Sequence, residues 1–282
     1  MTSADNQQET FLSPARNFYY SGFFAGEMSC SIIRAAHKGI GHYYTPDLTV
    51  SNNDLNLLQE VNVVVAQSNG VITAIKGGYN LSIRGKKKVS VALAFFDDYP
   101  VIVGDLANSK LLLLQQAMNF LSQRISSKPY SPEEKEVIEG YRAKLQHIKQ
   151  RGQPIGVFEW PVASNDAIGY FLAGVIDAEG SIGLKKRVDT YQPFFALAMK
   201  DRKIVELLKE FLGYGSVRYR LDGMYHYETG CLHDVLATVE LFTSVYPCKQ
   251  QHTRERMERL KRILNDHTRD TRGSILYDGQ LW

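Results

Sequence analysis

The sequence predicts an α+β fold of two αββαββα repeats related by pseudo-two-fold symmetry, with antiparallel sheets. Three observations support this prediction. An apolar helical segment over residues 168–182 carries an acid near its end, Glu179, and a weaker copy carries Glu27, 152 residues earlier (179 minus 27). Both copies have small residues four apart. The same order of elements follows each copy.

The second copy has two features that an ordinary core helix lacks. Ser164 or Asn165 can cap its start, as in any helix. Gly174 and Ala178 lie four apart on one face, which leaves room for another backbone to approach closely. Glu179 lies in the last turn, where the helix dipole disfavours negative charge. An acid in this place needs a nearby cation, and a bound metal would supply one.

The first copy is degenerate but keeps the same pattern. Gly22 and Gly26 are again four apart, and Glu27 takes the place of the acid. Met28 stands where the second copy has Gly180, a residue at which the helix could end in a left-handed conformation. We therefore expect a backbone cost at Met28.

The elements that follow each copy can be placed from periodicity and turn residues. In the first half we expect strands over 29–37 and 42–52, a helix over 54–67, a hairpin of strands 71–76 and 79–84, a segment 89–96 leading into Tyr99-Pro100, and a helix over 108–124. In the second half we expect strands over 183–188 and 191–199, a helix over 202–212, a hairpin of strands 216–220 and 224–228, and helices over 233–244 and 250–265. Gly77-Gly78 and Asp222-Gly223 mark the two hairpin turns.

A structured linker separates the halves. Ser131, Pro132, Glu133 and Glu134 form an N-cap, a first-position proline and an acidic first turn, so a helix should run to about residue 149. We therefore predict an N-terminal repeat over 11–128, a helical linker over 129–160 and a C-terminal repeat over 161–282.

Composition limits the class of protein without naming its partner. The chain has 282 residues, 44% of them hydrophobic, and a net charge of +3. Such a mild excess permits nucleic-acid binding but does not argue for it. Three widely spaced cysteines in no metal-ligand pattern indicate reduced thiols of an intracellular protein. We see neither a signal peptide nor an apolar run long enough for a membrane span, and expect a bacterial cytoplasm or the interior of a mitochondrion or chloroplast.

Residues 172–180 read Leu-Ala-Gly-Val-Ile-Asp-Ala-Glu-Gly and resemble the LAGLIDADG motif of homing endonucleases. With both copies present, the resemblance implies a single-chain, monomeric enzyme with saddle-shaped sheets and the motif helices packed at the centre. Such an enzyme would hydrolyse both strands of a long asymmetric double-stranded DNA target with divalent metal, leaving short 3′ overhangs. Members of this family are often intron-encoded, and the sequence leaves open an intron or a free-standing gene. Carried onto this sequence, the metal acids and catalytic residues are Glu27 and Glu179, and the carbonyl groups of Gly26 and Ala178 are further ligands. Oxygen donors suit Mg²⁺, for which Mn²⁺ or Ca²⁺ could substitute in binding.

The same resemblance implies a basic residue shortly after the proline of the late helix, where it would polarise the water network. In the second half this residue would be Lys249, two positions after Pro247. An exposed lysine at a helix start fits Lys249 equally well. In the first half Leu106 stands where a lysine is expected, and Lys110 lies a turn later. One active site could therefore be weaker, with a bias toward nicking.

The strands should form a saddle over the DNA major groove, with alternate side chains facing the bases. The candidate DNA contacts of the second half are Lys185, Arg187, Asp189, Gln192, Arg218, Arg220, Tyr225 and Tyr227. Those of the first half are Arg34, His37, Lys76, Ser82 and Arg84, beside a run of lysines at 86–88 that contacts phosphates or is merely exposed. The first-half register is open because Ile33 and Ala35 occupy the expected contact positions. For each contact, an ordinary solvated side chain is the alternative.

Two other functions compete with the endonuclease: an intron RNA maturase, and a DNA-binding protein whose catalysis has decayed. Retention of both Glu27 and Glu179 favours the enzyme, because neither binding function needs metal acids. Leu106 and Met28 favour decay. The sequence has no P-loop, dinucleotide-binding glycine motif or zinc-ligand spacing that would indicate another class of enzyme.

Overall fold

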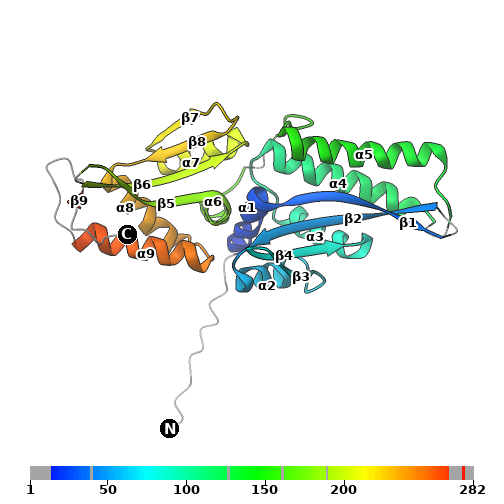
Figure 1. Cartoon of the computed structure of the whole chain (residues 1–282), viewed down its shortest axis with the longest axis horizontal. Helices are drawn as coiled ribbons and strands as arrows, with labels where there is room; N and C mark the ends of the chain where they lie inside the picture. Colours follow the sequence, from blue (N-terminus) through cyan, green and yellow to red (C-terminus); the bar gives the residue numbers. More distant parts are fainter. Residues whose placement is uncertain are drawn as a thin grey trace, which may run out of the picture.

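The computed structural model describes residues 14–38, 41–125, 128–159, 162–188 and 190–266, and the main chain of 275–276. Two similar α+β repeats lie side by side along the long axis of the molecule, and the helices α1 and α6 meet between them (Figure 1). This arrangement confirms the predicted fold class. No helix in the described part of the chain is long and apolar enough to span a membrane.

The elements repeat in the same order in the two halves. After a short 3-10 turn (Pro14–Asn17), the first half contains α1 (Phe18–Glu27), β1 (Ser29–His37), β2 (Gly41–Asn52), α2 (Leu55–Val64), β3 (Val71–Ile75), β4 (Gly78–Arg84), α3 (Lys86–Asp98) and α4 (Asp105–Gln123). Helix α5 (Pro132–Arg151) links the halves. The second half contains α6 (Asn165–Glu179), β5 (Gly180–Lys186), β6 (Thr190–Met199), α7 (Arg202–Leu212), β7 (Ser216–Tyr219), β8 (Tyr225–Thr229), α8 (Leu232–Glu240) with a π-helical turn (Leu241–Val245), α9 (Gln251–Asp266) and β9 (Ile275–Leu276).

Helix α3 covers a segment for which the sequence predicted no secondary structure. Its buried residues Val89, Leu93 and Phe96 follow the helical spacing i, i+4, i+7. The lysines at 86–88 form its first turn, and the Nζ of Lys86 donates a hydrogen bond to the Leu121 carbonyl of α4 at 3.0 Å. Lys86 is therefore partly used inside the protein rather than held out for phosphates.

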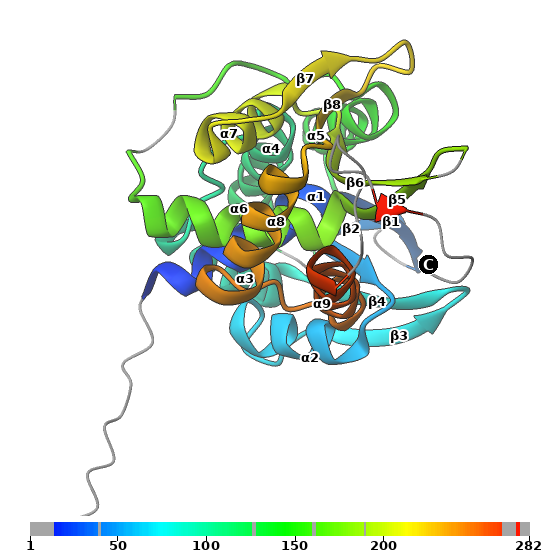
Figure 2. The ribbon, with the colours of Figure 1, turned by 90° about the vertical axis from the view of Figure 1, so that its left-hand side faces the viewer.

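Each half contains one antiparallel sheet, with strand orders β1-β2-β4-β3 and β5-β6-β8-β7; β9 pairs with β6. In Figure 2 the strands lie mainly on one side of the molecule and most helices on the other. Side chains alternate accordingly. Leu48, Leu81 and Ile83 are buried against the helices, whereas the neighbouring Thr49 and Ser82 are only half-buried on the opposite face. We call this opposite face of the two sheets the open face.

The two central helices are in backbone contact, as the small residues predicted. A Cβ added to Gly22 would lie 1.8 Å from the carbonyl oxygen of Phe171, and one added to Gly174 would lie 1.9 Å from that of Tyr19. Neither distance leaves room for a side chain. Further along, Gly26 lies against Ala178 and Glu179, so the acidic ends of α1 and α6 meet.

The expected left-handed helix ends are wrong. Gly180 has φ −73° and ψ 146°, and Met28 has φ −69° and ψ 140°. Both residues are extended because the chain passes directly from each central helix into the first strand of its sheet. Met28 therefore carries no conformational cost, and the degenerate motif does not weaken the first half at this point.

Each half caps the last long helix of the other. Asp54, the N-cap residue of α2, accepts a hydrogen bond from the Gln251 N–H of α9 at 2.8 Å, and Asp201, before α7, accepts one from the Leu106 N–H of α4 at 2.9 Å. The linker helix α5 begins with the predicted capping box on Ser131. These exchanged contacts fix the halves relative to each other.

Candidate active site

Two glutamates end the central helices, Glu27 on α1 and Glu179 on α6. A Cβ added to Gly26 would lie 2.5 Å from the Cβ of Ala178 and 3.2 Å from the Cγ of Glu179. The side chain of Glu179 therefore passes directly beside the backbone of the opposite helix. The structure thus brings together the four sequence-predicted residues Glu27, Glu179, Gly26 and Ala178.

The electrostatics of this pair favour a bound cation. Partial burial, and then the negative charge of Glu179, raise the pKa of Glu27 from 4.5 to about 7. Glu179 is exposed to solvent, but the protein atoms around its carboxyl group partly desolvate it and so raise its pKa. The positive charge of the Lys110 ammonium opposes this rise. A cation between the acids would relieve both the desolvation and the repulsion.

The donor set fits a hard divalent ion. No group of three or more His, Cys, Asp and Glu side chains that could hold a metal ion is found among the described residues. Mg²⁺ commonly uses one or two carboxylates together with waters and substrate phosphates. Glu27 and Glu179, with the main-chain oxygens beside them, supply that kind of incomplete shell.

A polar cavity of about 260 Å³ opens beside Glu27. The Nε2 of Gln250 donates to Asn52 Oδ1 at 3.0 Å and to Asn53 Oδ1 at 2.9 Å, so this wall is held by contacts between the two halves. The cavity is lined by Glu27, Asn52, Asn53, Asp177, Ala178, Gly180, Ile182, Gln250, His252, Thr253 and Arg256.

Asp177 positions the segment that carries this wall. Its buried Oδ2 accepts hydrogen bonds from the Tyr19 hydroxyl at 2.6 Å and from the N–H groups of Lys249 and Gln250 at 2.6 and 2.9 Å. Burial raises the pKa of Asp177, whereas these donors oppose that shift. Its other oxygen, Oδ1, is buried and has no hydrogen-bond partner among the described residues.

The ammonium of the candidate lysine of the second half is bound to groups other than the two acids. The Nζ of Lys249 forms an ion pair with Glu60 and donates to the Tyr20 hydroxyl at 2.8 Å, and it lies over the Tyr20 ring. Lys249 is also not among the residues that line the cavity beside Glu27. These contacts make Lys249 a structural link between the halves, and its catalytic role stays a prediction.

A different lysine, Lys110, contacts the main chain next to Glu27. Its Nζ donates to the Met28 carbonyl at 2.9 Å, directly after Glu27, and its charge lowers the pKa of Glu179. Burial lowers the pKa of Lys110 itself. From the sequence, Lys110 was placed one turn after Leu106 and was assigned no function. Sequence reasoning could not find Gln250 and His252, because nothing in their spacing indicates that they face Glu27.

The open face of the second sheet carries most of its predicted polar contacts. Lys185 of β5 and Arg218 of β7 both form ion pairs with Glu228 of β8. The Arg187 guanidinium donates to the Gln192 Oε1 at 2.7 Å. Arg220 pairs with Asp222 at 2.8 Å, and Asp189 lies outside the described residues. These partners hold the cations in place across the sheet.

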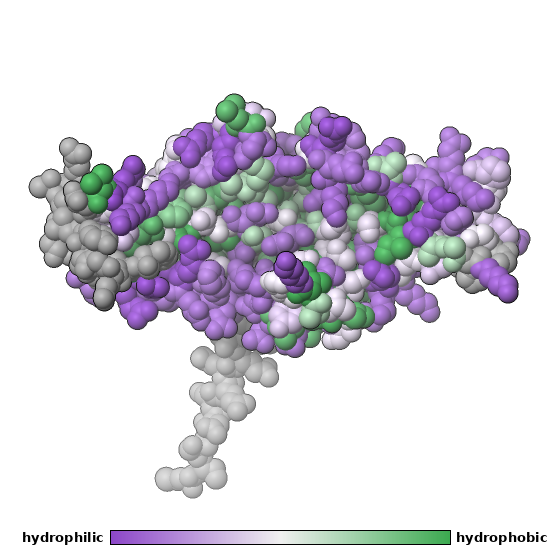
Figure 3. Space-filling model, viewed as in Figure 1, coloured by the Kyte–Doolittle hydropathy of each residue, from purple (hydrophilic) through white to green (hydrophobic). Residues whose placement is uncertain are grey.

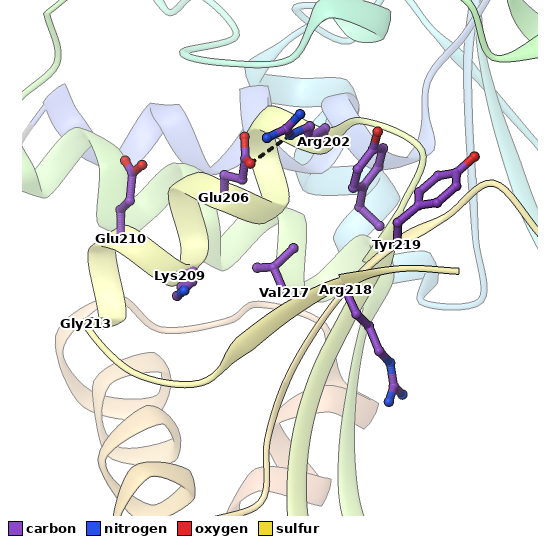
Figure 4. Close-up of a pocket in the computed structure, with 9 residues that line it drawn as sticks. Arg202, Glu206, Lys209, Glu210, Gly213, Val217, Arg218 and Tyr219 are labelled. Atoms are coloured by element: carbon purple, nitrogen blue, oxygen red, sulfur yellow. Dashed lines mark hydrogen bonds and ion pairs between the residues drawn. The ribbon is translucent and has the colours of Figure 1, made fainter. Parts of the chain in front are cut away.

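The predictions for Tyr225 and Tyr227 are wrong. Tyr227 is fully buried, and its hydroxyl donates to the Tyr214 carbonyl at 3.2 Å. Tyr225 lines a cavity of about 820 Å³ between α7 and the β7–β8 hairpin, on the helix-covered side of the sheet. Figure 4 shows Val217 and Tyr219 turned toward α7 and Arg218 turned to the other side of the strand. Both tyrosines pair with residues of that helix-facing set.

In the first half, Arg34 is also on the wrong face. It shares its side of β1 with the buried Cys30 and Ile32 and forms an ion pair with Glu139 of α5 at 3.1 Å. Its guanidinium therefore fastens the linker helix. The parity conflict noted at Ile33 was the sequence signal for this outcome.

The remaining first-half candidates are placed more favourably. On the open face, Asp47 accepts hydrogen bonds from Ser82 at 2.7 Å and from Arg84 at 3.2 Å. Lys76 is exposed in the turn between β3 and β4. The side chain of His37 lies outside the described part of the structure.

No protein-family model and no curated protein sequence matches the chain. Solved structures do match its fold. The LAGLIDADG homing endonuclease I-GzeII in complex with its DNA target aligns with a TM-score of 0.72 and 16% identity over 88% of this chain and 89% of that one. I-SmaMI bound to uncleaved DNA target in the presence of calcium ions aligns with a TM-score of 0.71 and 18% identity, over 89% of this chain and 92% of that one. The LAGLIDADG meganuclease I-CpaMI bound to uncleaved DNA aligns with a TM-score of 0.68 and 13% identity, over 88% of this chain and 92% of that one.

Proposed function

We propose that this chain, which has the two-repeat LAGLIDADG fold, is a site-specific DNA endonuclease of the homing type. The observation that carries the proposal is the meeting of Glu27 and Glu179 at the ends of two helices in backbone contact, between two sheets with open faces. One chain supplies both acids and both sheets, so a monomer suffices for a double-strand cut. The substrate we propose is a long, asymmetric DNA duplex, cut to leave short 3′ overhangs.

The protein's own residues would bind and orient the reacting phosphates. Glu27 and Glu179 would hold Mg²⁺, which when bound supplies an activated water and stabilises charge on the phosphate and leaving oxygens. The charge of Lys110 acts on Glu179, and its ammonium, which donates to the Met28 carbonyl, could also hold a water or a phosphate oxygen. Gln250, Asn52 and Asn53 supply hydrogen-bonding groups on the side of Glu27.

The unequal surroundings of the two acids imply unequal cuts. Lys110 acts on Glu179, whereas the cavity beside Glu27 contains His252 and Arg256 instead of a lysine. The guanidinium of Arg256 already donates to the Ile182 carbonyl. We therefore expect the two strands to be cut at different rates, with nicked DNA as an intermediate.

The test is cleavage of DNA selected from a randomised library by the full chain, with Mg²⁺ or with EDTA. Mg²⁺-dependent double-strand cleavage at one asymmetric site is expected for the wild type. Glu27→Gln and Glu179→Gln should lose it or only nick, whereas Glu136→Gln, at an exposed acid of α5, should cut normally. Cleavage that persists in both active-site variants would refute the assignment.

A DNA-binding protein without cleavage is the second candidate. It is favoured by Lys249, whose ammonium is committed to Glu60 and Tyr20. In the same experiment, tight sequence-specific binding with no cut under any divalent ion would support it. Binding to intron RNA in place of DNA would indicate a maturase.

A further inference from the structure

The open faces of the two sheets differ in chemistry at equivalent positions. Counted from the acids, Ile33 and Lys185 are both sixth residues (33 minus 27, 185 minus 179), and each pairs with the next strand at the matching position. Ala35 and Arg187 are both eighth residues. An apolar side chain in the first half thus stands in each place where the second half has a cation.

The outer hairpins repeat this difference. The third residue of β3 is Thr73 and that of β7 is Arg218, and they pair with Asn80 and His226, respectively. Ile75 holds the next outward-facing position of β3, and Arg220 directly follows β7 at the same place. Ile75 is 48% exposed and the Arg218 side chain 66% exposed, so both can reach a ligand on the open face.

The open face of the first sheet carries almost no net charge on its described strand residues. Among its described strand residues the charged side chains on the open face are Asp47 and Arg84, and these two pair with each other. Val71, which lies in line with Ser82 on this face, is 54% exposed. Figure 3 shows hydrophobic patches within a mainly hydrophilic surface on the side where the sheets face the viewer.

Apolar side chains and arginines read different base edges in the major groove. Aliphatic groups contact the thymine methyl group, whereas arginine makes paired hydrogen bonds to the O6 and N7 of guanine. Cations also contact phosphates and make binding dependent on salt. The position-by-position exchange of aliphatic for cationic residues therefore changes what each sheet can recognise.

We propose that the DNA target is divided by composition. The half-site facing the first sheet is A·T-rich and is read through thymine methyl groups by Ile33, Val71 and Ile75. The half-site facing the second sheet contains guanines read by Lys185, Arg187 and Arg218 and supplies most of the salt dependence. This inference rests on the proposed function only in requiring sequence-specific DNA binding, not cleavage.

The test uses the full chain and the DNA that it selects from a random library with Ca²⁺. Thymines are replaced by uracil, which lacks the methyl group, and guanines by 7-deazaguanine, which lacks N7, in one half-site at a time. Uracil in the A·T-rich half should weaken binding about fourfold for each contacted methyl. 7-Deazaguanine in the other half should weaken it about 5- to 150-fold.

Two variants assign the halves to the sheets. Ile75→Ser should remove the roughly fourfold uracil effect at the thymine that Ile75 contacts and leave the 7-deazaguanine effects unchanged. Arg218→Thr, which installs the residue of the equivalent first-half position, should remove the 7-deazaguanine effect at the guanine that Arg218 contacts, leave the uracil effects unchanged and lower the salt slope by about 1. Val63→Ser, at a 60% exposed residue of α2, should change neither. A selected site with both effects in both halves, or with the variants acting on the opposite halves, would overturn the inference alone. Selection of no DNA sequence would overturn the proposed function as well.

Discussion

Replacing Glu27 with glutamine should stabilise the metal-free protein at high pH. The native state holds the Glu27 proton up to a pKa of about 7, whereas the unfolded chain releases it near 4.5. Because the unfolded state binds fewer protons between these values, the free energy of unfolding of the wild type falls as the pH rises through this range. Integrated from pH 5 to pH 8, the loss is about 2 kcal/mol. Glu27→Gln removes the ionisable group and with it this loss.

The assay is urea unfolding of both proteins in EDTA at several pH values. The variant should match the wild type near pH 5 and exceed it by about 2 kcal/mol at pH 8. Mg²⁺ should narrow that gap by binding the paired carboxylates of the wild type. Glu136→Gln is the control and should show no dependence on pH relative to the wild type. A difference between Glu27→Gln and the wild type that stays constant from pH 5 to pH 8 would refute the reasoning.

Three further predictions follow from contacts around the same site. Gly174→Ala should destabilise the protein by about 3 kcal/mol or more, because the new Cβ would lie 1.9 Å from a backbone oxygen. Gly140→Ala in α5, where a Cβ meets nothing within 4 Å, is the control and should be neutral or stabilising. Equal unfolding midpoints for the two variants would contradict the packing of the central helices. Asp177→Ala should cost on the order of 3 kcal/mol in chemical unfolding, since three donors lose their acceptor; an unchanged midpoint would show that they are satisfied elsewhere. Lys110→Met should slow the cut of one strand by about 10²-fold in a strand-resolved cleavage assay. Lys249→Met should lower the stability of the protein and change the cleavage rates of both strands equally. The reverse pattern would support a catalytic role for Lys249.

Local pattern was sufficient for the elements that depend on near neighbours in sequence. The Ser131 capping box, the glycine-led hairpin turns and the two acid-terminated helices are set by contacts within a few residues, and the structure contains all of them. Helix α3 was missed although Val89, Leu93 and Phe96 have helical spacing, because three lysines and a glycine precede them and obscure its start.

The sequence by itself determined the paired acids, the small residues that let their helices touch, and the order of the two repeats. Only the tertiary structure decided which side chains face the open side of each sheet. Arg34 and Tyr227 lie on the helix-covered side because strand register and helix packing, not charge or polarity, set the direction of every second residue. It also placed the ammonium groups of Lys110 and Lys249 against different partners, because these contacts depend on how one half packs against the other. Contacts between segments far apart in the chain leave no local pattern, and these contacts complete the site around Glu27 and Glu179.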